Sequence, residues 1–228
     1  FILHPHNMVS SVQRRQMTTV KDVNIHNIAL EGTFDDCQKI VKDLFLDVEI
    51  QSRTSLTAVN SINWARLIAQ AVYYFWAYTQ LNSDKIGFIV PSGNFGNIFS
   101  ARLAQYMGLP IDQLHLVTNA NDILHRTITS GEMTTDTVKK TYSPSMDIQV
   151  SSNFERQIFE SVRRNSNELK KIMEFFSNKG SYSLSSETLE DLQSIYHSHS
   201  VSNDQTLETI KKFKNNYNYL ADPHTETG

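Results

Sequence analysis

The sequence predicts an α/β fold with parallel or mixed sheets flanked by helices in two domains. Short apolar runs rich in β-branched residues, typical of buried strands, alternate with segments whose apolar residues recur every three or four positions. This alternation favours parallel sheets, because each crossover helix returns the chain to the same end of the sheet. The clearest unit runs from a strand at 86–90, through a turn with two glycines, into a helix that ends near Met107.

Length, charge and cysteine content limit the classes of protein to consider. The 228 residues are enough for one large domain or two small ones, and a net charge of −3 indicates no basic surface for nucleic acid. No apolar run approaches the ~20 residues that span a bilayer. We therefore expect no nucleic-acid or membrane partner. The single cysteine, Cys37, excludes an internal disulfide and indicates a reducing compartment, which we expect to be the cytoplasm.

The first part of the chain predicts two strands and two helices in alternation. The strands are expected at 1–4 and 23–30, and the helices begin after Ser10 and Thr33. Thr33 and Asp36 have the spacing of a capping box, in which each residue hydrogen-bonds the backbone of the other. The strand–helix order predicts that these two strands pair in parallel.

The domain boundary is expected in the polar stretch 47–58, which has no clear period. Residues 1–58 would form the later half of a smaller α/β domain, and residues 59–228 part of a larger one. The chain begins at Phe1 inside a predicted strand, whereas natural ends usually lie outside such elements. We expect it to be a piece of a longer protein.

The larger part begins with a predicted helix at 61–81, capped by Asn60 or Ser61 and apolar almost all round, as in a helix buried between layers. A later helix is expected at 122–129, ended by Gly131. The remaining predictions are strands at 113–118 and 217–221, a loop at 132–152, and helices at 153–164, 166–178, 186–197 and 204–216.

The turn at 91–97, with the sequence PSGNFGN, has the character of an anion site. The first N–H groups of a helix lack partners and carry partial positive charge, and glycine lets the backbone approach a ligand closely. The spacing is neither that of a P-loop nor that of a dinucleotide fold, so a small phosphate ester fits better than ATP or NAD. No lysine or arginine lies between Ile86 and Ala101. Taken alone, the two glycines are more typical of simple packing between a strand and a helix than of a binding site.

Several blocks of sequence, in order and spacing, resemble the threonine synthase family, whose members are pyridoxal-phosphate (PLP) enzymes of fold type II. The likeness is to the long fungal and proteobacterial type, and it spans most of the chain. The blocks are 60–66 (NSINWAR), 90–97 (VPSGNFGN), 107–110 (MGLP), 118–122 (TNAND), 143–148 (SPSMDI), 151–156 (SSNFER) and 222–225 (DPHT).

The resemblance implies a fold like that of the tryptophan synthase β chain and a carbon–oxygen lyase activity in threonine biosynthesis. The substrate would be O-phospho-L-homoserine, converted with water into L-threonine and phosphate. The cofactor would be pyridoxal 5′-phosphate, and the enzyme a monomer or homodimer. The larger domain would bind the cofactor.

The resemblance also assigns cofactor-binding residues. Gly93, Asn94, Phe95, Gly96 and Asn97 would hold the cofactor phosphate. The family's DPHT segment supplies a hydroxyl to the pyridine nitrogen, which here would be Thr225. After this segment the family usually continues Ala-Val-Gly, whereas this chain continues Glu-Thr-Gly.

A second phosphate site, for the substrate, is expected at the start of the helix that follows residue 60. Asn63 and Arg66 lie three apart on one face, with Ser61 beside them, and an arginine fork near free N–H groups suits a phosphate dianion. The resemblance implies the same residues. The alternative is that Asn60 or Ser61 only caps the helix and that Arg66 lies on the surface.

No catalytic residue is identified. The family's Schiff-base lysine lies upstream in an Ala-Phe-Lys-Asp-like segment that this chain lacks, so we expect it outside the chain. The pairs His4/His6 and His197/His199 lack zinc-site spacing, so no metal site is predicted, and no G-x-S-x-G elbow supports a serine triad.

Two other functions stay open at this point. One is a related phospho-lyase that takes the same phosphorylated substrates and ends in a keto acid. The other is a non-catalytic protein that binds PLP or phosphate, which the missing lysine favours.

Overall fold

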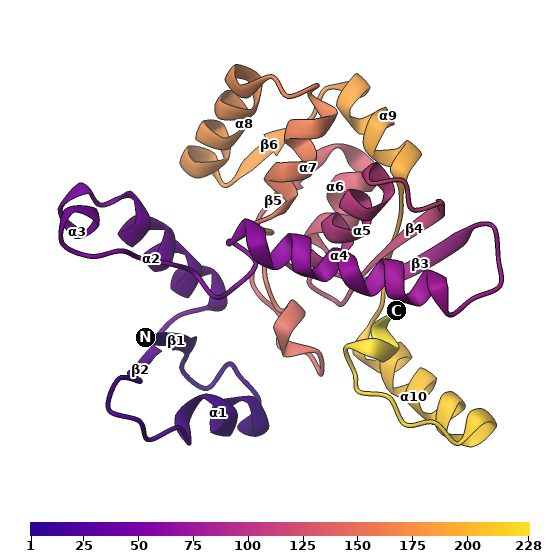
Figure 1. Cartoon of the computed structure of the whole chain (residues 1–228), viewed down its shortest axis with the longest axis horizontal. Coiled ribbons are helices and arrows are strands. Elements are labelled where there is room, and N and C mark those ends of the chain that lie inside the picture. Colours follow the sequence, from indigo (N-terminus) through magenta and orange to yellow (C-terminus); the bar gives the residue numbers. More distant parts are fainter.

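The computed structural model describes all 228 residues as an α/β molecule, with a smaller N-terminal part beside a larger body (Figure 1). The strands are β1 (Ile2–Pro5), β2 (Asn27–Leu30), β3 (Ile86–Pro91), β4 (Ile111–Thr118), β5 (Glu132–Thr134), β6 (Ser181–Ser183) and β7 (Tyr196–Ser200). The helices are α1 (Ser11–Thr18), α2 (Phe34–Leu46), α3 (Val48–Arg53), α4 (Trp64–Thr79), α5 (Gly96–Tyr106), α6 (Ile123–Ser130), α7 (Phe154–Ser161), α8 (Ser166–Lys179), α9 (Ser186–Ile195) and α10 (Asn203–Tyr217), with short 3₁₀ turns η1 (Pro144–Met146) and η2 (Thr225–Thr227).

The strands form three small sheets. In the smaller part β1 and β2 pair in parallel, as the alternation of strand and helix predicts. The larger body has a parallel sheet in the order β3-β4-β7, with β4 in the middle. A third sheet pairs β5 and β6 antiparallel. The predicted α/β class with parallel and mixed pairing is therefore confirmed.

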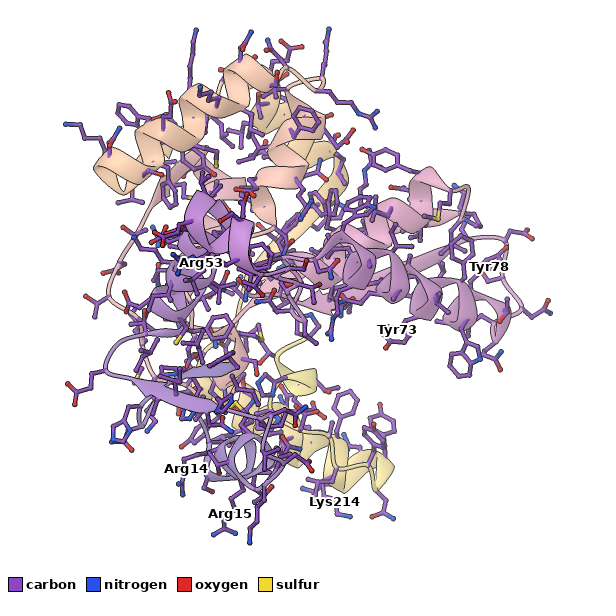
Figure 2. All side chains as sticks on the ribbon, turned by 60° about the vertical axis from the view of Figure 1, so that its left-hand side comes forward. Arg14, Arg15, Arg53, Tyr73, Tyr78 and Lys214 are labelled. Carbon is purple, nitrogen blue, oxygen red and sulfur yellow. The ribbon has the colours of Figure 1, made fainter.

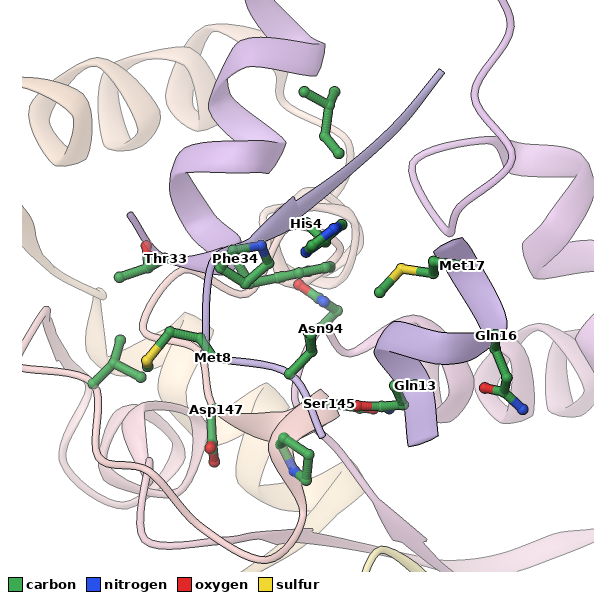
Figure 3. Close-up of a pocket in the computed structure, with 15 residues that line it drawn as sticks. His4, Met8, Gln13, Gln16, Met17, Thr33, Phe34, Asn94, Ser145 and Asp147 are labelled. Carbon is green, nitrogen blue, oxygen red and sulfur yellow. The ribbon is translucent and has the colours of Figure 1, made fainter. Parts of the chain in front are cut away.

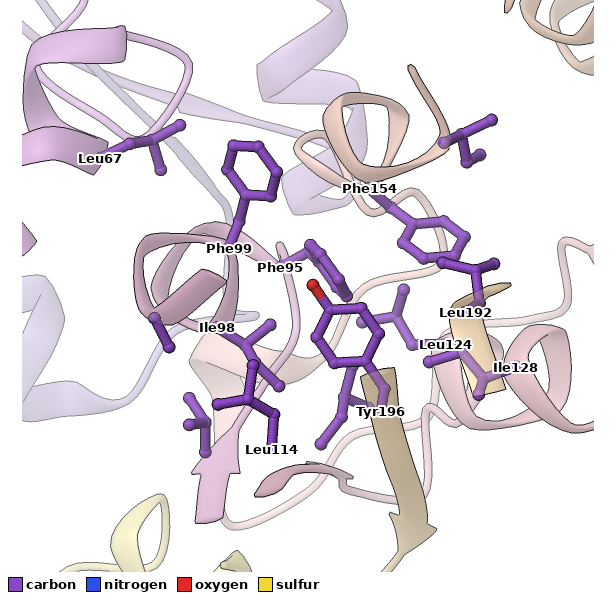
Figure 4. Close-up of a cluster of buried hydrophobic side chains, with 14 of the residues drawn as sticks. Leu67, Phe95, Ile98, Phe99, Leu114, Leu124, Ile128, Phe154, Leu192 and Tyr196 are labelled. Carbon is purple, nitrogen blue, oxygen red and sulfur yellow. The ribbon is translucent and has the colours of Figure 1, made fainter. Parts of the chain in front are cut away.

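The core lies where β4 meets α5, α6, α7 and α9. It is one cluster of 24 buried apolar residues, and Figure 4 shows its central side chains. Phe95 lies in the middle, edge-on to Phe154 at 5.0 Å and to Tyr196 at 5.3 Å between ring centroids. The Tyr196 hydroxyl donates to Gln157 Oε1 at 2.7 Å, so this buried polar tip has a partner. The core therefore supports the turn between β3 and α5 from behind.

Several local signals are confirmed. Ser10 caps α1 by accepting from the Gln13 N–H, and Thr33 and Asp36 form the predicted capping box at the start of α2. Gly131 ends α6 in the left-handed conformation that glycine adopts readily. These devices act within a few residues, so the sequence alone reveals them.

The helix predicted at 61–81 differs from expectation in its start and its surroundings. It begins at Trp64, and its cap is Asn63, whose Oδ1 accepts from the Ala65 N–H at 3.0 Å. It is not buried between layers, because one face is open: Val72 is 61% exposed and Trp76 is 65% exposed. Only the opposite face, with Leu67 and other buried residues, joins the core.

Other boundaries also differ. The polar stretch 47–58 contains α3, which Asp47 caps by accepting from the Ile50 N–H. The helix predicted at 186–197 ends at Ile195, because Tyr196 begins β7 and pairs with β4. No strand forms at 217–221, since α10 ends at a left-handed Asn218. The predicted loop 132–152 includes β5, and the strand predicted at 23–30 is limited to β2.

Charged side chains lie on the outer surface. Figure 2 shows Arg14, Arg15 and Lys214, all solvent-exposed, extending away from the body. No helix combines the length and apolarity that crossing a bilayer requires.

Replacing Leu116 by Ala should destabilise the protein by about 2–5 kcal/mol, because Leu116 is fully buried in the central strand and its loss leaves a cavity. Urea denaturation measures this change in unfolding free energy. Leu81→Ala, at a position 53% exposed, is the matched control and should change it by less than ~0.5 kcal/mol. Equal effects of the two substitutions would contradict the assigned core.

Candidate functional site

The turn between β3 and α5 presents a run of backbone N–H groups. From Gly93 to Ile98 these groups donate to no acceptor within the protein. The helix α5 that follows has no acidic residue in its first turn and no side-chain cap. Unsatisfied amides at the positive end of a helix dipole bind anions. The turn therefore has the features of an anion cradle, which we define as residues 93–97.

Phe95, in the cradle, has a φ of +62°, in the left-handed region that a bulky residue rarely adopts. Such a conformation costs of order 1–3 kcal/mol and persists only where surrounding structure holds it. The ring is clamped between Phe154 and Tyr196 in the core. Packing of one side chain thus fixes the direction of the neighbouring backbone amides.

A cleft of about 390 Å³ opens at the cradle. Its walls come from the segment before α4 and the first turns of that helix, from the cradle, from η1 and from the C-terminal turn. Arg66 is the one lysine or arginine in this lining. The lining residues are Asn60, Ser61, Arg66, Gln70, Pro91, Ser92, Gly93, Asn94, Phe95, Gly96, Asn97, Ser145, Met146 and His224.

The two glycines of the cradle allow the walls of this cleft to pack closely. A Cβ on Gly93 would lie 3.0 Å from the Met146 Cα, and a Cβ on Gly96 would lie 3.0 Å from the Ser61 Cβ. Neither glycine has a positive φ. They are needed for loop-to-loop contact and not for an unusual backbone conformation.

The asparagine side chains of the cradle are oriented by neighbours. Asn97 Oδ1 accepts from the Tyr74 hydroxyl at 2.6 Å, and burial raises the pKa of Tyr74, which keeps this donor protonated. Asn94 Oδ1 accepts from Gln38 Nε2 at 3.1 Å. With both oxygens occupied, the NH₂ groups are the parts of Asn94 and Asn97 left to donate to a ligand.

Helix α2 of the smaller part is tied to the cradle and to the loop beside it. Besides the Gln38 contact, Asp35 Oδ2 accepts the N–H groups of Gln149 at 2.9 Å and Val150 at 3.1 Å. Burial raises the pKa of Asp35, although these two bonds oppose the shift. The smaller part is thus held against the cradle by partly buried polar contacts.

A second cavity, of about 440 Å³, lies between α1, β1 and the loop that contains Ser145 (Figure 3). Asn94 and Ser145 line both cavities. Gln13 Nε2 donates to Ser145 Oγ at 3.0 Å across it. The region around the cradle is therefore open toward the smaller part as well.

The C-terminal turn forms another wall of the cleft through His224. Asp222 accepts from the Thr225 hydroxyl at 2.8 Å and from the His224 N–H at 2.8 Å. His224 Nε2 accepts from the Ser145 N–H at 3.2 Å, which leaves Nδ1 to donate to Asp222 Oδ1 at 3.1 Å. Partial burial raises the pKa of Asp222, but the hydrogen bonds from Thr225 and His224 outweigh it and lower that pKa overall.

Comparison with known proteins finds relatives that match the whole chain. The whole chain is 49% identical to threonine synthase from Pseudomonas aeruginosa and 43% identical to that from Saccharomyces cerevisiae. Among solved structures, PLP-bound threonine synthase from Brucella melitensis matches the whole chain with a TM-score of 0.88 and 45% identity. The match covers 50% of the Brucella chain. Over its whole length the chain is similar to threonine synthases.

The chain spans about half the length of the curated relatives it matches, 49% of the Pseudomonas protein and 48% of the yeast protein. No protein-family model matches it. Maize serine racemase, at 16% identity and a TM-score of 0.60, shares the fold alone. The predicted resemblance to threonine synthases and the predicted type II fold are confirmed.

Most residues that the threonine synthase resemblance singled out lie together. Gly93 through Asn97, Ser61 and Arg66 all line the cleft. No group of three or more His, Cys, Asp or Glu side chains has the geometry of a metal site.

Two residues that the threonine synthase resemblance singled out lie outside the lining of the cleft. The Asn63 amide is engaged locally, since its Nδ2 donates to the Ala58 carbonyl at 2.9 Å while its Oδ1 caps α4. Thr225 is exposed and its hydroxyl donates to Asp222.

Sequence reasoning missed Asn60 and His224, which line the cleft where Asn63 and Thr225 do not. Both residues belong to the motifs quoted above, in which the sequence analysis assigned Asn63 and Thr225 to the site instead. Asn60 Oδ1 accepts from the Ile62 N–H at 3.0 Å, so a local turn aims this residue toward the cleft. The spacing of one helical turn was too coarse to separate Asn60 from Asn63.

Replacing Asp222 by Asn should lower the melting temperature at pH 7, because the carboxylate stabilises the C-terminal turn in its charged form. Its pKa is held below the usual 3.8, so this contribution is present above pH 3.8 and is lost as the pH falls through the lowered value. Thermal denaturation from pH 7 to pH 3 should show a difference between wild type and variant that narrows below pH 3.8. A difference that widens on acidification would contradict this assignment.

Proposed function

We propose that this chain is part of an enzyme that uses PLP to convert O-phospho-L-homoserine and water into L-threonine and phosphate. The observation that carries the proposal is the presence of two anion-binding elements in one cleft. The cradle offers backbone amides, and Ser61 and Arg66 face the same space from another wall. This reaction needs both, one for the phosphate of the cofactor and one for that of the substrate.

The cradle suits the phosphate of PLP. Gly93, Asn94, Phe95, Gly96 and Asn97 would hold it through unsatisfied N–H groups, and their neighbours supply no competing carboxylate. Thr225 would meet the pyridine nitrogen. Because its hydroxyl already donates to Asp222, it would offer lone pairs to a protonated ring nitrogen. When bound, PLP supplies an electron sink for charge that develops on the substrate carbons.

The substrate phosphate would be held by Arg66, Ser61 and Asn60. A guanidinium fork pairs with two oxygens of a phosphate, and the hydroxyl and amide add hydrogen bonds that fix its orientation. Asn63 would serve the same site by capping α4 and fixing the loop that carries Ser61. Two anchored phosphates hold the reacting carbons at a defined place between them.

The synthase outcome is favoured over the keto-acid alternative by similarity. The chain is 49% identical to the Pseudomonas threonine synthase but 34% identical to the rat protein named threonine synthase-like 2. Incubation of the PLP-loaded, full-length protein with O-phospho-L-homoserine, followed by identification of the organic product, tests the proposal. L-Threonine is the expected product. A 2-keto acid would instead indicate a phospho-lyase, and the absence of turnover would indicate a non-catalytic binding protein.

We further propose that residues 1–58 belong to a smaller domain and 59–228 to the cofactor-binding domain. The separate β1–β2 sheet supports this division. A cytoplasmic location is proposed for the whole enzyme, supported by the single free cysteine, Cys37. We also propose that the enzyme is a monomer or homodimer.

Replacing Gly93 or Gly96 by Val should abolish retention of PLP. The added side chain would meet Met146 or Ser61 and displace the amides of the cradle. Retention is measured from the PLP absorbance of the protein fraction after gel filtration. Gly108→Ala, where an added Cβ meets nothing within 4 Å, is the control and should retain PLP, although its φ of +101° makes some loss of stability expected. Unchanged cofactor absorbance in both cradle variants would overturn the assignment.

Replacing Arg66 by Ala should weaken binding of O-phospho-L-homoserine by about 10- to 100-fold, because a charge-assisted bond to phosphate contributes about 1.5–3 kcal/mol. PLP binding should change far less. Titration of the PLP-loaded protein with substrate, and of the apoprotein with PLP, compares the two affinities. An equal loss of affinity for both ligands would contradict the assignment of Arg66 to the substrate site.

A further inference from the structure

Asn153 lies directly before α7, in the SSNFER block, outside the lining of the cleft. Its side chain is fully buried. An asparagine at a helix N-cap normally accepts a hydrogen bond from the helix's own first amides, yet Asn153 makes no such bond. The side-chain amide forms its hydrogen bonds with Ser61, Asn94 and Arg156 instead.

The side chain of Asn153 joins the two anion-binding walls of the cleft. Its Nδ2 donates to Ser61 Oγ at 3.1 Å on one side and to the carbonyl of Asn94 at 3.1 Å on the other. The Asn153 backbone N–H also donates to that Asn94 carbonyl, at 3.2 Å. One buried amide thus spans from the cradle to the segment that carries Ser61 and Arg66.

Arg156 fixes which way this amide points. Its Nε donates to Asn153 Oδ1 at 3.1 Å, so the oxygen faces Arg156 and the NH₂ group faces the cleft walls. Its Nη2 donates to the Ile62 carbonyl at 3.0 Å, and its guanidinium lies over the Trp64 ring at 5.5 Å. Arg156 therefore holds both the amide and the segment that the amide contacts.

This arrangement has a chemical consequence at Ser61. A hydroxyl that accepts from Asn153 still has its own proton to donate. Because Ser61 lines the cleft, that proton is available to an anion bound there. The absence of a Cβ at Gly96 permits the contact, since an added Cβ would lie 3.3 Å from Asn153 Nδ2 and 3.0 Å from the Ser61 Cβ.

We propose that Asn153, oriented by Arg156, is a positioning residue that fixes Ser61 as a donor to the substrate phosphate and couples the two phosphate sites. The proposal rests on the function proposed above, because it takes Ser61 as part of the substrate site. Asn153 itself contacts neither phosphate.

A double-mutant cycle on the full-length, PLP-loaded protein tests the coupling. Ser61→Ala in the wild-type background should raise the KM for O-phospho-L-homoserine about tenfold, with a smaller effect on kcat. In an Asn153→Ala background the same change should alter KM less than twofold, because the hydroxyl is already misaligned. Asn153→Asp keeps the shape but lacks the NH₂ donors, so it should raise KM as Asn153→Ala does.

Gln157→Leu is the matched control, since Gln157 is fully buried one turn along α7 and bonds the core residue Tyr196 instead of the cleft. It should lower the melting temperature and leave KM unchanged. A rise in KM with Gln157→Leu equal to that with Asn153→Ala would show a merely structural role. A tenfold effect of Ser61→Ala in both backgrounds would also overturn the proposal.

A binding readout separates this inference from the proposed activity. Inorganic phosphate should raise the melting temperature of the apoprotein, and Asn153→Ala should reduce that shift more than Gln157→Leu does. If wild type makes no product, the proposed function fails while the phosphate shift still tests the coupling. Equal shifts in the two variants would overturn the coupling whether or not the enzyme turns over.

Discussion

A run of backbone amides without partners, at the junction of β3 and α5, is the constraint on which the rest of the structure depends. Unpaired N–H groups and a left-handed Phe95 both cost free energy, so the surroundings must hold them in place. The buried rings of Phe154 and Tyr196 do this from the core. The hydrophobic core and the cleft are therefore two sides of one turn.

The side chains around this turn share a pattern of occupied oxygens. Asn94, Asn97 and Ser61 each accept a hydrogen bond from a neighbour, from Gln38, Tyr74 and Asn153 respectively. Each is thereby left with hydrogens to give. A cleft lined with oriented donors selects negative charge with little help from cations, and donors fixed before a ligand arrives need no reorganisation when it binds.

Features set by neighbours in sequence could be predicted, and those set by distant contacts could not. The Thr33 capping box, the stop at Gly131 and the strand–turn–helix of the cradle depend on residues a few positions apart. The end of α9 depends on the pairing of Tyr196 with β4, which no local pattern reveals. In the site, the motif named the cradle and Arg66, which line the cleft, but that Asn60 lines it and Asn63 does not depends on where each amide bonds.

The open face of α4 bears on how this polypeptide behaves by itself. Val72, Tyr73 and Trp76 present a largely solvent-facing apolar surface on one helix, of a kind that soluble monomers rarely leave uncovered. Relatives of twice the length carry additional polypeptide that could lie over such a surface. Produced by itself, the chain would expose that apolar stripe to other copies, so we expect it to self-associate.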